Sequence, residues 1–289
     1  DLGGDAYEGC NENLVFTRPD VVKRVSQKYL AAGADIVETN TFGATPLVLG
    51  EYGLSDKAFE VNRIACELAR EACREFSTPD WPRFVAGSIG PTTKAISVTG
   101  GISFDELAAH YLEQVKGLYA GGADYFLIET CNDTINIKAC LHAIDRFHAA
   151  LDPNDPQQVP LPVAISGTIE PMGTMLAGQG VDALCTSLAN RDLLYIGLNC
   201  ATGPEFMTDH IRTLAALAPF PVACVPNAGL PDENGRYLET PELVQRFLRE
   251  AETWIRLEQH PNIVRAYYVG TLQGQPYVFL EYVAGSDLR

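Results

Sequence analysis

The chain has 289 residues, 46% of them hydrophobic, which is enough to form one large buried core. Its formal net charge of -16 repels the phosphates of nucleic acids and anionic lipids, and no apolar run approaches the roughly 20 residues that a membrane-spanning helix needs. We therefore expect a soluble, cytoplasmic protein that binds neither nucleic acid nor a membrane. Its eight cysteines form no Cys-x-x-Cys pair, so we expect reduced thiols.

Six short runs rich in Val, Ile, Phe and Ala are typical of parallel strands that are buried on both faces. Segments with helical periodicity lie between them. Ser103 and Glu106 form a capping box, Asp133 begins a further helix, and Pro241 begins the last long one. This alternation predicts a parallel α/β fold. The six runs are residues 34–42, 84–91, 123–130, 162–169, 195–200 and 221–229.

Polar residues gather where each of these runs stops. In a (β/α)8 barrel all strand ends converge on one mouth, whereas in an open sheet only those near the switch point do, so polar residues at all six ends favour a TIM barrel. Only about six core strands are found, and we predict a barrel that lacks its first and eighth strands. The polar ends are Thr39 to Thr41, Ser88, Glu129 with Thr130, Ser166, Asn199 with Cys200, and Asn227.

The character of the sequence changes after residue 249. Two runs that alternate like strands, residues 265–272 and 276–283, flank Gly274 and predict a β-hairpin. We therefore divide the chain into an incomplete barrel, residues 1–249, and a short C-terminal extension, residues 250–289.

Two residues at the predicted mouth are candidates for chemistry. Cys200 ends a strand and precedes a tight turn into a helix, so its thiol is either a ligand or nucleophile, or a packed core group. Glu129 ends a very apolar run, where an ionised carboxylate is costly unless it is paired. Either a functional role, an ion pair or a solvated strand end would explain it.

Several motifs, in order over about 240 residues, resemble the homocysteine-binding domain of cobalamin-dependent methionine synthase. They are DLGG (1–4), YEGCNENL (7–14), ETNTFGA (38–44), AGSIGPT (86–92), TGGI (99–102), GTMLAGQ (173–179), GLNCATGPE (197–205) and PNAGLP (226–231).

The resemblance implies a (β/α)8 barrel that transfers a methyl group to the thiol of homocysteine and yields methionine. It implies a Zn²⁺ held by three cysteine thiolates, of which Cys200 matches the first. Glu129 matches the residue that holds the amino group of homocysteine, and Thr130 and Asn227 lie at matching mouth positions. The implied methyl donor is methylcobalamin, regenerated from methyltetrahydrofolate, with both bound by separate modules.

The chain departs from this family pattern in two places. The first strand, with its Asp-Gly-Ala-Met-Gly-Thr run, is expected before Asp1, and the adjacent cysteine pair that completes the zinc site occurs nowhere in the sequence. One thiolate alone does not make a zinc site. A catalytically inactive, truncated or fused fragment is therefore the alternative to an active enzyme. A lesser alternative is a methyltransferase for another thiol or a selenol, with S-methylmethionine or betaine as donor.

The extension resembles a different family. The segments HPNIV (260–264) and FLEYVAGSDL (279–288) look like part of the N-lobe of a serine/threonine protein kinase. The glycine-rich loop, the strand lysine, His-Arg-Asp and Asp-Phe-Gly of that family are missing, so the resemblance implies no kinase activity.

Overall fold

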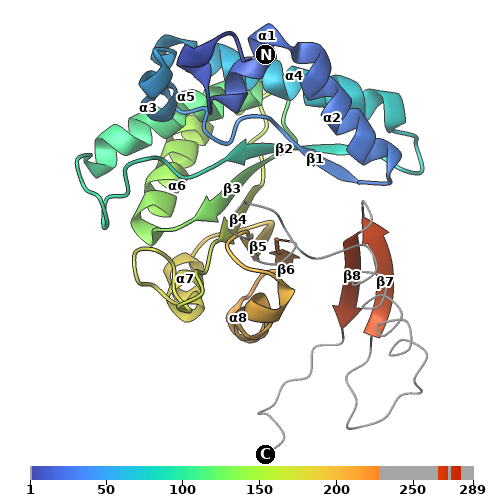
Figure 1. The fold of residues 1–289 in the computed structure, drawn as a ribbon, viewed down its shortest axis with the longest axis vertical. Coiled ribbons are helices and arrows are strands. Elements are labelled where there is room, and N and C mark those ends of the chain that lie inside the picture. Colours follow the sequence, from blue (N-terminus) through green and yellow to red (C-terminus); the bar gives the residue numbers. More distant parts are fainter. Residues whose placement is uncertain (1, 228–265, 273–274, 281–289) are drawn as a thin grey trace, which may run out of the picture.

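The computed structural model describes residues 2–227, 266–272 and 275–280, and its main feature is a parallel sheet of six strands (Figure 1). The strands follow one another in sequence order, and the sheet curls into a half-barrel. The expected helix after residue 241 and the expected boundary near residue 249 lie outside the described residues. The strands are β1 (Ile36–Glu38), β2 (Phe84–Ile89), β3 (Tyr125–Cys131), β4 (Val163–Gly167), β5 (Tyr195–Asn199) and β6 (Val222–Val225).

Helices connect successive strands and cover the convex face of the sheet (Figure 1). The α/β class expected from the sequence is thus confirmed, and the described strands form a half-barrel where an incomplete TIM barrel was expected. The helices are α1 (Leu14–Thr17), α2 (Pro19–Ala31), α3 (Pro46–Leu49), α4 (Ala58–Phe76), α5 (Phe104–Gly121), α6 (Thr134–Ala149), α7 (Val181–Leu188) and α8 (Pro204–Leu217). Short 3-10 turns, η1 (Asp5–Tyr7), η2 (Asn11–Asn13), η3 (Gly50–Tyr52) and η4 (Ser55–Lys57), lie in the first part of the chain.

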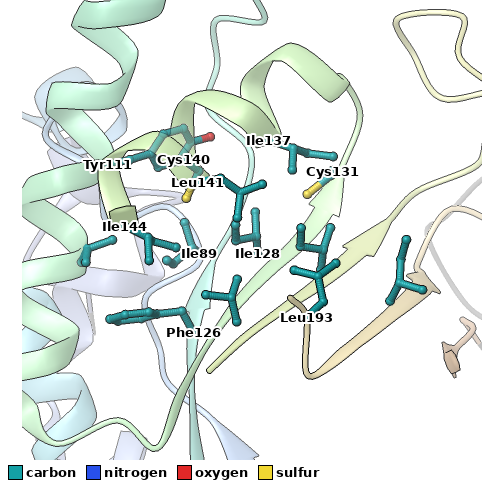
Figure 2. Close-up of a cluster of buried hydrophobic side chains, with 14 of the residues drawn as sticks. Ile89, Tyr111, Phe126, Ile128, Cys131, Ile137, Cys140, Leu141, Ile144 and Leu193 are labelled. Carbon is teal, nitrogen blue, oxygen red and sulfur yellow. The ribbon is translucent and has the colours of Figure 1, made fainter. Parts of the chain in front are cut away.

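The largest core cluster lies between the convex face and the helices (Figure 2). Strand β3 shows the alternation that creates it: Phe126 and Ile128 belong to this cluster, whereas Tyr125 and Leu127 belong to a separate one on the opposite face. Burial of a side chain such as Phe126 contributes about 2–3 kcal/mol. Successive side chains of a strand point to opposite faces, so Glu129 lies on the same concave face as Tyr125 and Leu127.

Helices α4 and α5 approach each other closely at two glycines. A Cβ added to Gly117 would lie 2.6 Å from the carbonyl oxygen of Phe59, and one added to Gly121 would lie 2.5 Å from that of Arg63. Only the absence of a side chain allows the two backbones to come this near. The pair anchors the helical layer behind β2 and β3.

Several local predictions are confirmed. The capping box of Ser103 and Glu106 begins α5, and the side chain of Asp133 caps α6 by accepting a hydrogen bond from the backbone of Ile135. The expected hairpin is present as β7 (Ala266–Leu272) and β8 (Gln275–Leu280), which pair antiparallel. All eight cysteines are free thiols.

None of the helices in the described part of the chain is both long enough and apolar enough to cross a lipid bilayer.

Candidate functional site

The four residues expected at the site all lie at the carboxyl ends of strands. Glu129 and Thr130 are among the last residues of β3, Cys200 directly follows β5, and Asn227 lies two residues beyond β6. The hydroxyl of Thr130 lies 3.8 Å from the sulfur of Cys200, so these two come together as a site requires. Asn227 joins the same loop through its backbone, whose N–H donates to the carbonyl of Thr202 at 3.1 Å.

A second acidic residue, which the motif reasoning did not assign to the site, lies beside Glu129. Glu38 ends β1, and the charge of Glu129 on β3 acts on its carboxyl group. Ser88, at the end of the intervening strand β2, donates a hydrogen bond of 2.5 Å to Oε1 of Glu129. The sequence did hold a signal, because Glu38 ends an apolar strand just as Glu129 does.

The surroundings of the two carboxyl groups favour their neutral forms. Loss of hydration, together with the charge of Glu129, raises the pKa of Glu38 to about 7, although Glu38 keeps contact with solvent. Loss of hydration also raises the pKa of Glu129, while the hydrogen bond from Ser88 lowers it. Two carboxylates held close together bind a cation or a proton more readily than either would alone. The concave face therefore presents an acidic pair suited to a positively charged group.

The side-chain amide of Asn199, the last residue of β5, connects Thr130 to Cys200. Its oxygen accepts from the backbone N–H of Thr130 at 3.0 Å, and its nitrogen donates to the hydroxyl of Thr130 at 2.7 Å. The same nitrogen lies 3.2 Å from the sulfur of Cys200. Thr168 in turn donates to the carbonyl of Asn199 at 3.0 Å, which fixes the end of the strand.

Three residues at this point have left-handed backbone conformations. Thr130, Cys200 and Ala201 have φ values of 53°, 59° and 50°, and they are the only residues other than glycine with positive φ in the described part of the chain. Each such residue costs about 1–2 kcal/mol relative to ordinary conformations. Strain of this kind persists only where surrounding contacts hold it, and it concentrates at functional sites.

The described residues do not match a zinc site of three thiolates. No group of three or more His, Cys, Asp or Glu side chains in these residues could hold a metal ion. The neighbours of the Cys200 sulfur are the amide of Asn199 and the hydroxyl of Thr130, neither of which is a thiol. Cys224 on β6 packs its sulfur 3.4 Å from that of Met207 on α8, on the convex side.

Below the acidic pair, two tyrosines form the floor of the concave face. The hydroxyl groups of Tyr125 on β3 and Tyr195 on β5 lie 3.2 Å apart, with the rings packed edge to face. The charges of Glu38 and Glu129 both act to raise the pKa of these hydroxyls, after the larger effect of burial. The two tyrosines thus stay neutral and offer an aromatic surface beneath the acids.

A comparison with protein families assigns the chain to one of them. The sequence model of the homocysteine S-methyltransferase family matches residues 2–270, which is most of the chain. This chain belongs to the homocysteine S-methyltransferase family. As the family's name states, its members are methyltransferases that act on homocysteine, and this agrees with the class of enzyme expected from the motifs.

Solved structures of a homocysteine methyltransferase share the fold of this family member. The metallated form of MmuM from Escherichia coli superposes with a TM-score of 0.66 at 22% identity, covering 79% of this chain and 78% of that one. The oxidized form gives a TM-score of 0.67 at 22% identity and covers 86% of this chain and 80% of that one. At this identity the likeness shows that the two proteins share a fold.

Proposed function

We propose that this chain binds homocysteine at the carboxyl ends of its strands, with the substrate ammonium beside Glu129 and Glu38. The observation that carries the proposal is the acidic pair of Glu38 and Glu129. Both carboxyl groups have raised pKa values, and a cation bound between them would stabilise their ionised forms. Thr130, Cys200 and Asn227 border the same mouth. The substrate thiol would then extend toward Cys200, at the end of β5.

The reaction proposed for this site is transfer of a methyl group to the homocysteine thiol, which yields methionine. A free thiol has a pKa near about 8.5 and attacks only as its thiolate, so the reaction needs a group that removes the proton. In the resembling family a zinc ion supplies that activation. The described residues of this chain provide one candidate thiolate, Cys200, and we assign no step to a metal here.

Because the described residues offer only one candidate zinc ligand, Cys200, they also support a second candidate function. In this alternative the chain binds homocysteine and transfers no methyl group. Zinc content decides between the two. We expect an active enzyme to hold near one zinc per chain when purified in reduced form, and to lose it on Cys200→Ala. Zinc far below one per chain and unaffected by Cys200→Ala would favour the binding function.

For the active form, we propose methylcobalamin as the methyl donor, carried by a separate module and regenerated from methyltetrahydrofolate by another. Residues 173–179 and 201–204 support it, because they resemble the cobalamin enzyme. Assays with methylcobalamin, S-methylmethionine and betaine as sole donors would test this choice. If methionine formed only from S-methylmethionine or only from betaine, methylcobalamin would be rejected as the donor.

Substrate binding can be tested without any methyl donor. Titration calorimetry with L-homocysteine should show binding that weakens at least about tenfold in Glu129→Gln, since a charge-assisted contact contributes about 1.5–3 kcal/mol. Glu113→Gln is the matched control, because Glu113 lies on the outer helix α5 and its exposed pair with Lys116 contributes little. Equal affinity in Glu129→Gln and the wild type would reject Glu129 as the ammonium ligand.

A further inference from the structure

The ends of β1 and β2 are joined by a closed ring of buried hydrogen bonds. The backbone N–H of Ser88 donates to Oγ1 of Thr39 at 3.0 Å, and Oγ1 of Thr41 donates to the carbonyl of Ser88 at 2.7 Å. The two threonine hydroxyls lie 2.6 Å apart. Because Thr41 gives its only proton to Ser88, Thr39 must be the donor between them. The ring thus runs from Ser88 through Thr39 and Thr41 back to Ser88.

A glutamine from the helical layer fastens this ring from behind. Nε2 of Gln114, on α5, donates to the carbonyl of Thr41 at 2.7 Å and lies 3.4 Å from the carbonyl of Ser88. Gln114 and Thr41 are 0% exposed, and Ser88 is 2% exposed. Oε1 of Gln114 is buried without a hydrogen-bond partner in the described part of the chain. Apart from this oxygen, the buried polar groups of the ring are hydrogen-bonded to one another, and the cost of breaking such bonds in the interior holds their geometry in place.

One side chain leads from this ring to the concave face. The ring uses the backbone of Ser88, which leaves its hydroxyl free to donate to Oε1 of Glu129 at 2.5 Å. A hydrogen bond from a hydroxyl to a carboxylate with this oxygen–oxygen distance is of the strong, charge-assisted kind. It favours the ionised carboxylate and opposes the effect of burial on the Glu129 pKa. No hydrogen bond to Oε2 of Glu129 comes from the residues that the structure describes.

We infer that Ser88 is a positioning residue for substrate recognition: held by Thr39, Thr41 and Gln114, it orients Glu129 and leaves one carboxylate oxygen for the substrate ammonium. This inference rests on the proposed homocysteine binding. It adds that the affinity for the amino group depends on a hydroxyl that does not touch the substrate. The ring uses only backbone atoms of residue 88, so an alanine at this position would keep the ring but lose the hydrogen bond to Glu129. The role proposed for the hydroxyl thus accounts for a serine at the end of β2.

The test compares two ligands that differ only in the amino group, L-homocysteine and 4-sulfanylbutanoate. We expect Ser88→Ala to weaken homocysteine binding about tenfold, the effect of one charge-assisted hydrogen bond, and to change 4-sulfanylbutanoate binding less than about twofold. Ser88→Thr, which restores the hydroxyl, should recover most of the loss. Ser26→Ala is the matched control, because Ser26 is also buried but lies on α2.

A second variant guards against a folding defect in Ser88→Ala. Thr41→Val keeps the shape of the side chain and removes the donation to Ser88, so it should give a smaller loss for homocysteine alone. If either variant weakens both ligands equally, or Ser88→Ala leaves homocysteine binding unchanged, the positioning role is wrong. If the wild type binds neither ligand, the proposed function itself fails and the inference fails with it.

Discussion

Asn199 holds Thr130 by two hydrogen bonds, at 3.0 Å to its backbone N–H and 2.7 Å to its hydroxyl, and so joins the end of β5 to the end of β3. Strand β4 lies between β3 and β5 in the sheet, so the side chain of Asn199 spans β4 on the concave face to reach Thr130. Both residues that the amide contacts, Thr130 and Cys200, have left-handed backbones. Asn199 therefore holds together a locally strained site.

Replacement of Asn199 by alanine should destabilise the fold by about 2–3 kcal/mol, because it removes two part-buried hydrogen bonds and leaves the N–H of Thr130 without its acceptor. Urea unfolding followed by circular dichroism measures the change. Asn190→Ala, at an exposed position after α7, is the control and should lie within about 0.5 kcal/mol of the wild type. A loss for Asn199→Ala as small as the control's would show that the bridge contributes little.

Ala201 allows the opposite kind of test. Its φ of 50° is unfavourable for any residue with a Cβ, whereas glycine adopts this conformation at little cost. Ala201→Gly should therefore raise the free energy of unfolding by about 0.5–1 kcal/mol, after the greater freedom of glycine in the unfolded chain is subtracted. Ala216→Gly, at an exposed helical position in α8, should lower it by about 1 kcal/mol. If Ala201→Gly and Ala216→Gly lowered the free energy of unfolding by the same amount, the backbone of Ala201 would not be strained.

The sequence predicted those features of the site that local pattern determines. The positions of Glu129, Thr130 and Cys200 at strand ends follow from apolar runs and the polar residues that stop them. The capping box at Ser103 and the cap at Asp133 follow from side chains that bond to their own helix. Such local interactions need no knowledge of the tertiary structure.

The features that sequence reasoning missed depend on contacts between distant segments. The pairing of Glu38 with Glu129 and the bond from Gln114 to Thr41 join residues far apart in the chain. No periodicity in the sequence indicates that the side chain of Asn199 reaches across β4 to Thr130. The strand-end polar residues were recognised as a group, but the hydrogen bonds that divide them into an acidic pair and an amide bridge appear only in three dimensions.

Glu38 should make stability depend on pH in a direction unusual for a carboxyl group. Its pKa is about 7 in the folded protein and near its ordinary value of 4.5 in the unfolded chain. Between these values the folded state binds more protons, so stability falls as the pH rises from about 4.5 to 7. The groups that face Glu38 are Glu129, Tyr125 and Tyr195, and none of them supplies a positive charge.

Glu38→Gln should therefore raise the melting temperature at pH 8 and leave it unchanged at pH 4, where the wild-type carboxyl is already protonated. Thermal unfolding at both pH values measures this. Glu113→Gln should show no such dependence, since its exposed pair with Lys116 is weak. A lower melting temperature for Glu38→Gln at pH 8 would mean that the ionised form of Glu38 is stabilised in the folded protein.

The crossing of α4 and α5 provides a prediction independent of the site's chemistry. An alanine in place of glycine within a helix ordinarily stabilises a protein by about 0.5–1 kcal/mol. At Gly117 the added Cβ would lie 2.6 Å from the carbonyl oxygen of Phe59 and 2.7 Å from Cβ of Asn62, and backbone cannot move aside cheaply. Gly117→Ala should instead destabilise by about 1–3 kcal/mol, as overpacking does.

Gly117→Ala should also disturb substrate binding, because α5 carries Gln114 one turn earlier, behind the ring that holds Ser88. Urea unfolding gives the stability, and homocysteine calorimetry on the same sample gives the affinity. Lys116→Ala, on the exposed side of the same turn, should change neither by much. A Gly117→Ala protein as stable as the wild type would show that the helices can separate without cost, while a destabilised protein with unchanged affinity would show that the ring holds Ser88 independently of the helix crossing.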